Sequence, residues 1–224
     1  MSRELLTVFF NIQAACIFVS FITSLSLISN KQIPKYMRGF FWYPMIGILA
    51  IAPAFIARNF SESWFVFGFI ANKFSILFHY SFLSIFIIRA IPGKKNDIYL
   101  SIIFWLFLLL ILFFLLGVNI ETRSDHSFAI ANLGLVVYCI AYYYYLFNNS
   151  PTFNLISEPA FWIITGIFFS MSVHIPIFLT IDILHFKISI NTYRLLISVS
   201  IFCYSLMHIF FIKAYLCAIH PRIT

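Results

Sequence analysis

Polar side chains recur at helical spacing within two long apolar runs of the chain. Asn72, Ser75 and His79 are three and four residues apart, which places them on one face of a helix. A second apolar run carries His208 at a similar depth, and the polar residues before it are Arg194, Ser198 and Ser205. Ionisable groups inside a membrane segment are costly unless they pair or bind something, so two facing stripes predict a polar seam.

Three interpretations of His79 and His208 stay open in the sequence. The two imidazoles could hold helices together by hydrogen bonds. They could instead form a ligand pocket or a proton-responsive site, because histidine titrates near neutral pH. They could also ligate a haem from two sides, although nothing beyond their equal depth favours this. The sequence identifies no cofactor.

A lysine lies deep inside the same apolar run. Lys73 is about ten residues below the predicted outer end, a depth from which its ammonium group reaches the interface with difficulty. His174 and Gln13 lie near this level in other predicted helices. We therefore predict an outward-opening pocket of Gln13, Lys73 and His174; the alternative is that Lys73 bends up to Glu62.

Two outer loops carry side chains that could ligate a metal ion. They are Asp125 and His126 in one loop, and Asp182 and His185 in the other. Asp182 and His185 are three residues apart, on one helical face, and carboxylates with imidazoles suit divalent cations. The alternative is a solvated acidic rim. The chain contains no HExxH motif and no glycine-rich phosphate loop.

The segment 147–162 is nearly uncharged and rich in proline and aromatic residues. The residues in it that we predict to make contacts are Pro151, Asn154, Glu158, Phe161 and Trp162. Such a strip is more typical of a docked segment than of a solvated loop. It could pack on its own bundle or on a partner protein.

The composition fixes the surroundings of these residues. Apolar residues make up 62% of the 224 positions and charged residues only 9%, whereas a soluble domain has about a quarter charged. The outer surface must therefore face lipid. The formal charge of +7 comes from Lys and Arg beside apolar segments, where they mark topology, so nucleic acid is not a predicted partner.

The apolar runs predict an all-α membrane protein, a single bundle of seven transmembrane helices in one domain covering 1–224. A crossing needs about 20 residues, and lipid offers no partner for exposed backbone groups, so only helices fit. The predicted spans are Leu5–Ser29, Gly39–Ala57, Trp64–Ile91, Ile98–Val118, Phe128–Phe147, Ala160–Asp182 and Thr192–Leu216. Short loops predict antiparallel neighbours in chain order.

Lys and Arg are more numerous on one side of the predicted membrane, with eight against five. The side with fewer also carries most of the acidic residues. The positive-inside rule then predicts an external N-terminus and a cytoplasmic C-terminus.

One short stretch carries a resemblance. The entry Glu158-Pro159-Ala160-Phe161-Trp162-Ile163 and the following Gly166-Ile167-Phe168-Phe169 resemble small uncharacterised bacterial seven-helix proteins. Similar helical regions precede the kinase portion of some membrane sensor histidine kinases. The resemblance implies a bacterial inner-membrane protein connected with signalling. The chain departs from the sensor kinases after Leu216, where no coiled coil or catalytic domain follows.

These features favour a non-enzymatic membrane subunit, one that senses a small or lipidic ligand or serves as an adaptor for a signalling or export partner. Its expected partners are the lipid bilayer and another membrane or cytoplasmic protein. The second hypothesis is a small transporter that uses the Lys73–His174 pocket. The third is a metal-dependent membrane enzyme on the outer face.

Overall fold

The computed structural model describes residues 3–29, 33–34, 36–48, 64–92, 94–117, 125–149, 155–183 and 188–219, and every regular element in them is helical. The six long helices are α1 (Arg3–Ser29), α3 (Trp64–Ala90), α4 (Lys94–Gly117), α5 (Asp125–Asn149), α6 (Pro159–Ile183) and α7 (Ile190–Ile219). A 3-10 turn, η1 (Leu155–Ser157), precedes α6, and residues 42–48 form a short helix.

Each long helix contains an apolar stretch of 18 to 30 residues, long enough to cross a membrane. Their exposed sides are apolar as well. On α4 the most exposed large side chains are Phe113 and Leu116, of which Leu116 is 84% exposed. Large apolar side chains at this exposure suit a lipid exterior better than water. The described part is therefore all-helical and has the build of a multi-pass membrane protein, as the sequence predicts.

Six of the seven predicted spans correspond to long helices, with ends that differ by no more than four residues. The largest difference is at α4, which begins at Lys94 rather than Ile98 because the helix continues past its apolar core into charged residues. The predicted span Gly39–Ala57 is described only in part. Its helix begins at 42, after turns over 36–41, and residues 49–57 lie outside the described part, so the seventh crossing stays a prediction.

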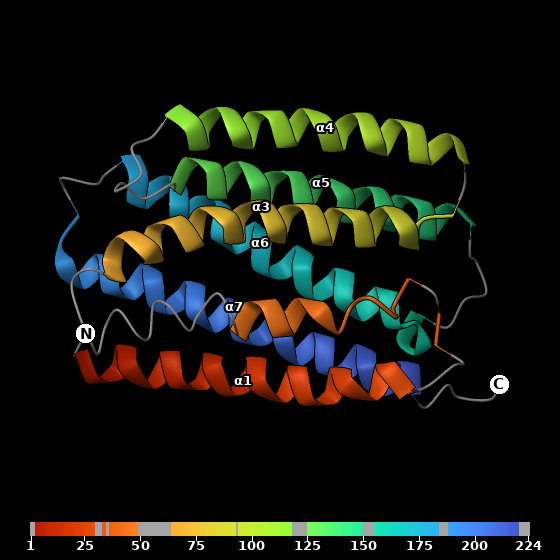
Figure 1. Cartoon of the computed structure of the whole chain (residues 1–224), viewed down its shortest axis with the longest axis horizontal. Helices are drawn as coiled ribbons and strands as arrows, with labels where there is room; N and C mark the ends of the chain where they lie inside the picture. Colours follow the sequence, from red (N-terminus) through yellow and green to blue (C-terminus); the bar gives the residue numbers. More distant parts are fainter. Residues whose placement is uncertain are drawn as a thin grey trace.

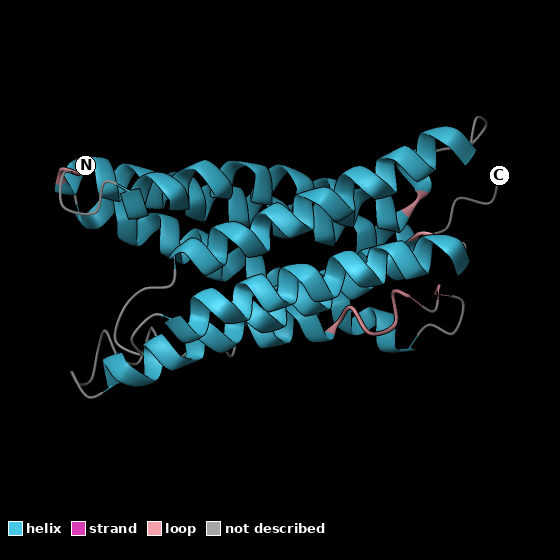
Figure 2. Cartoon of the chain, turned by 90° about the horizontal axis from the view of Figure 1, so that it is seen from above, coloured by secondary structure: helices cyan, strands magenta, loops and turns pink. Residues whose placement is uncertain are grey.

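The long helices lie roughly side by side along the long axis of the molecule (Figures 1 and 2). Consecutive helices from α3 to α7 contact each other in chain order, while α1 packs against α7. In Figure 1, α1 and α7 run in the same direction. We call the end of the bundle where α3 begins the Trp64 end, and the opposite end, where α6 begins, the Glu158 end.

Buried tyrosines attach the outlying helix α4 to the bundle. The hydroxyl of Tyr138 on α5 donates to the Leu100 carbonyl oxygen at 3.1 Å, and that of Tyr80 on α3 donates to the Phe104 carbonyl oxygen at 3.2 Å. Leu100 and Phe104 are one turn apart, so both bonds reach the same face of α4. Buried hydroxyl groups that find partners in this way stabilise a contact between otherwise apolar helices.

Two glycines permit close packing. A Cβ atom at Gly166 would lie 2.8 Å from Phe210 Cβ and 3.3 Å from the Met207 carbonyl oxygen, which shows how closely α6 approaches α7. A Cβ atom at Gly134 would lie 2.8 Å from Tyr80 Cε2. Small residues are common where membrane helices approach closely, because they let the backbones come together.

Candidate functional site

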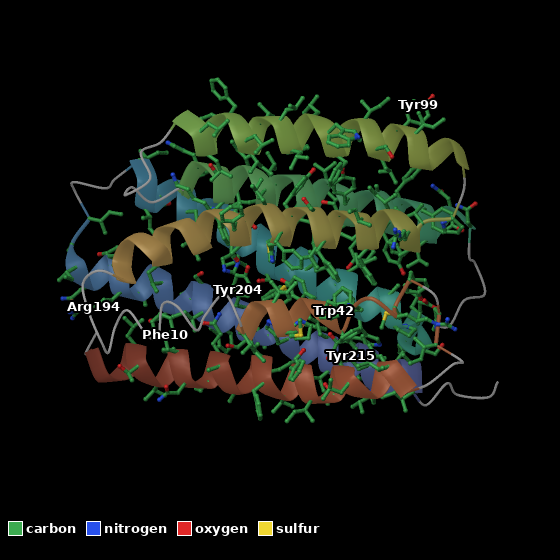
Figure 3. All side chains as sticks on the ribbon, in the orientation of Figure 1. Phe10, Trp42, Tyr99, Arg194, Tyr204 and Tyr215 are labelled. Atoms are coloured by element: carbon green, nitrogen blue, oxygen red, sulfur yellow. The ribbon has the colours of Figure 1, made fainter. Side chains whose placement is uncertain are left out.

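Three of the predicted site histidines gather in the interior. His79 on α3, His174 on α6 and His208 on α7 are each at most 7% exposed. Tyr204 on α7 lies between two of them, with its ring centroid 5.9 Å from His79 and 4.9 Å from His174. Tyr204 is labelled in Figure 3. We give the name histidine cluster to these three histidines, to Tyr43 and Tyr204, whose rings contact them, and to the buried Asn132, which helix geometry places at the level of His174.

Tyr43 completes the contact between the two histidines that the sequence paired. Its ring centroid is 5.6 Å from that of His79 and 6.3 Å from that of His208. Its hydroxyl is hydrogen-bonded to His79 Nδ1 at 2.6 Å. The predicted polar seam between α3 and α7 is thus bridged by a tyrosine from the segment that follows α1.

Aromatic contacts extend the cluster to α5. Phe128 on α5 stacks on His79 at 6.4 Å and contacts Phe178 on α6 at 4.5 Å, and Phe178 in turn stacks on His174 at 5.7 Å. With Tyr204, these contacts form a closed circuit of rings from α3, α5, α6 and α7. The side chains of His79 and His174 are therefore held in one layer of the bundle.

The hydrogen bonds of His174 define its tautomer. The Nδ1–H of His174 donates to the Ser170 carbonyl oxygen one turn earlier, at 2.5 Å. A carbonyl oxygen only accepts, so Nδ1 carries the proton, and Nε2 of the neutral ring is an acceptor. The Ser200 carbonyl lies close to the same ring, but Nε2 has no partner of acceptable hydrogen-bond geometry.

Several other buried polar atoms of the cluster also lack a hydrogen-bond partner. They include His79 Nε2, His208 Nδ1 and both amide atoms of Asn132. Helices α5 and α6 run antiparallel with Phe128 beside Phe178, so one turn further along each helix places Asn132 at the level of His174. Leaving such groups unpaired in a medium without water is unfavourable, and each one calls for an explanation.

The predicted pocket of Gln13, Lys73 and His174 stays a prediction. Gln13 on α1 and Lys73 on α3 are half-buried, whereas His174 is fully buried within the histidine cluster. Lys73 lies six residues before His79, about 9 Å along the helix axis. Ser75 of the predicted stripe is half-buried, and the side chain of Asn72 lies outside the described part.

The predicted metal ligands are only partly described. His126 is exposed at the start of α5, and its ring centroid is 5.9 Å from that of Phe114. The side chains of Asp125 and Asp182, and the whole of His185, lie outside the described part. Within the described side chains, no three histidine, cysteine or acidic groups come together in a way that could hold a metal ion. The outer-face metal site therefore stays a prediction.

The described residues of the predicted contact strip make contacts with the protein itself. Glu158 accepts a hydrogen bond from the Tyr36 hydroxyl, and Trp162 Nε1 donates to the Ile156 carbonyl oxygen at 2.8 Å. The Trp162 ring also stacks on Phe210 of α7 at 5.9 Å. Phe161 packs on Tyr143, at 6.4 Å between centroids. Pro151 and Asn154 lie outside the described part, and a partner for this strip stays a prediction.

Tyr43, Tyr204 and Asn132 are not among the site residues predicted from the sequence. Asn132 is an isolated amide in an apolar run, a signal of the kind that identified the histidines. The tyrosines gave no comparable signal, because the chain has 12 of them and an interfacial position explains most tyrosines in membrane helices.

Comparisons of the chain with protein-family models, with curated proteins and with solved structures found no match. The helices themselves indicate a multi-pass membrane protein. In the described interior, the buried histidines from α3, α6 and α7 meet in the histidine cluster.

Proposed function

We propose that the protein is a non-enzymatic multi-pass membrane protein that binds a small molecule at the histidine cluster and so senses it. The observation that supports this proposal is the set of unpaired buried atoms: one ring nitrogen on each of three histidines and both amide atoms of Asn132. An unsatisfied buried donor or acceptor costs about 1–3 kcal/mol. A bound molecule with matching hydrogen-bonding groups would remove that cost at several atoms together.

The chemistry of these atoms restricts the ligand. With the proton on Nδ1, Nε2 of His174 is an acceptor, and an N–H or O–H group of the ligand would satisfy it. Asn132 has both an unpaired acceptor and an unpaired donor, so the ligand must also carry an acceptor. An uncharged molecule with a hydroxyl or amide group meets both requirements, and the low dielectric of the interior favours an uncharged ligand over an ion.

We also propose that the protein lies in a bacterial inner membrane with its N-terminus outside and its C-terminus in the cytoplasm. The excess of Lys and Arg on one side of the predicted membrane supports this orientation. In this orientation the Glu158 end of the bundle faces the cytoplasm. A sensor of this kind would pass its signal to a separate membrane or cytoplasmic protein, which would meet the bundle at that end.

Native mass spectrometry of the protein in mild detergent tests the binding proposal. We expect the wild type to carry a molecule of discrete mass, and we expect His174→Leu and Asn132→Leu to lose it. His126→Leu is the matched control, because His126 is exposed and outside the cluster, and it should keep the molecule. The proposal is wrong if wild type and His174→Leu carry the same small-molecule content, or if neither carries any. The cluster would then serve packing alone.

A small transporter is the second candidate. The observation that favours it is the half-buried Lys73 on the same helix as His79, closer to the Trp64 end. Lys73→Met should abolish accumulation of the transported molecule in cells that overproduce the protein, as measured by comparing their small-molecule content. Under the sensing proposal the same variant leaves that content unchanged.

A further inference from the structure

The segment 36–48, which we call the wedge, enters the bundle between α3 and α7. Its side chains Met37 and Phe40 are at most 1% exposed and Tyr43 is 5% exposed, although turns rather than a long helix carry the first half of the segment. Successive backbone hydrogen bonds join Phe40 N to the Met37 carbonyl oxygen and Tyr43 N to the Phe40 carbonyl oxygen. The wedge is therefore continuously bonded from its first turn to its helix.

One end of the wedge is attached at the Glu158 end of the bundle. The Tyr36 hydroxyl donates to the carboxylate of Glu158, the residue directly before α6. Burial, and then this hydrogen bond, raise the pKa of Tyr36 above its usual range, so the phenol stays a donor at physiological pH. Trp162, one turn into α6, donates to η1 and stacks on α7. This end of the wedge therefore contacts the entry of α6.

The middle of the wedge is fixed by aromatic packing on both neighbouring helices. The Phe40 ring centroid is 4.6 Å from that of Phe86 on α3 and 5.2 Å from that of Phe211 on α7. The Phe86 ring also contacts Tyr36, at 5.9 Å. Displacement of Phe40 would disturb both helices, because buried rings in a packed interior have little free space.

The other end of the wedge reaches the histidine cluster. Tyr43 is hydrogen-bonded to His79 Nδ1 and lies against His208. Tyr36 and Tyr43 are seven residues apart in the sequence. A single short segment thus joins a carboxylate at one end of the bundle to the imidazoles in its interior.

We propose that the wedge couples the state of the histidine cluster to the Tyr36–Glu158 contact. This inference rests on the proposed function, in that the stimulus is a molecule bound at the cluster. A neutral imidazole carries one proton, so the partner of His79 Nε2 determines whether Nδ1 donates to Tyr43 or accepts from it. A ligand that donates to Nε2 leaves the proton on Nδ1, which then donates to Tyr43, whereas a ligand that accepts from Nε2 leaves Nδ1 to accept from the Tyr43 hydroxyl. The direction of this hydrogen bond favours one position of Tyr43 and, through Phe40, one position of the wedge.

The coupling can be measured without a ligand, because the reactivity of the His79 ring depends on which of its two nitrogens carries the proton. Diethyl pyrocarbonate modifies the unprotonated ring nitrogen of histidine, and peptide mass spectrometry gives the rate for His79 alone. We expect Tyr36→Phe and Glu158→Gln to change that rate at least about fivefold, the lower limit of typical allosteric coupling. Tyr138→Phe is the matched control, since it removes a buried tyrosine hydrogen bond away from the wedge, and it should leave the rate unchanged.

The reverse measurement uses hydrogen–deuterium exchange. Tyr43→Phe should speed amide exchange in residues 155–162 at the other end of the wedge, whereas Tyr138→Phe should not. If Tyr36→Phe fails to fold, Glu158→Gln carries the test, since it keeps the shape of the side chain. If His79 is modified at the wild-type rate in the folded variants, the proposed coupling through the wedge is wrong, while the proposed binding at the cluster is unaffected. Absence of a bound molecule would overturn the proposed function and leave the coupling measurable.

Discussion

Replacing Gly166 with alanine tests the close approach of α6 to α7. The new Cβ would lie 2.8 Å from Phe210 Cβ and 3.3 Å from the Met207 carbonyl oxygen. Both atoms are fixed to the α7 backbone, so the helices must separate by several tenths of an ångström. Overpacking of this kind costs about 1–3 kcal/mol, and the higher helix propensity of alanine offsets up to about 1 kcal/mol. We expect Gly166→Ala to lower the free energy of unfolding by about 1–2 kcal/mol.

Thermal unfolding with a thiol-reactive dye measures this effect, because the buried thiols of Cys139 and Cys203 become reactive only on unfolding. For a chain of this size the loss corresponds to a melting temperature lower by about 2–8 °C. Gly117→Ala is the matched control, since its Cβ meets nothing within 4 Å, and it should melt within about 2 °C of wild type. A Gly166→Ala variant as stable as wild type would refute the packing of α6 on α7.

Two further substitutions test single hydrogen bonds. Tyr138→Phe should lower the free energy of unfolding by about 1 kcal/mol, because it removes the hydrogen bond to the Leu100 carbonyl oxygen. Tyr144→Phe is the control and should be neutral, because Tyr144 is exposed. Equal melting temperatures for the two variants would contradict the Tyr138–Leu100 hydrogen bond. Burial and the hydrogen bond to Glu158 raise the pKa of Tyr36 in the folded protein. The stability that the neutral phenol contributes is therefore complete below the pKa of tyrosine in the unfolded chain, about 10, and is lost as the pH rises above that value. Wild type should therefore lose more stability than Tyr36→Phe between pH 8 and pH 11 in thermal melts, and parallel losses would argue against a buried phenol.

The sequence predicted the long helices well because their length is set by the apolar run. It was less accurate at the ends, since α4 continues from Ile98 back to Lys94 through residues that no hydropathy argument would include. The segment that begins at Gly39 was predicted as a span from its composition. Its first residues instead form turns that let Phe40 and Tyr43 enter the interior, which depends on contacts with α3 and α7 rather than on local pattern.

The candidate site was predicted in part. His79, His174 and His208 were identified because ionisable groups in apolar runs are costly, and that argument needs no structure. Their meeting with Tyr43 and Tyr204 could not be predicted. The rotation of each helix about its axis decides which side chains meet, and helices that are apolar on all sides carry little periodic signal of that rotation.

An experimental structure in lipid nanodiscs, at a resolution that shows ordered small molecules, tests the central claim most directly. We expect density within hydrogen-bonding distance of His174 Nε2 and Asn132, too large for water and absent in His174→Leu. Tightly closed side chains with no density beside these atoms, in wild type and variant alike, would contradict it.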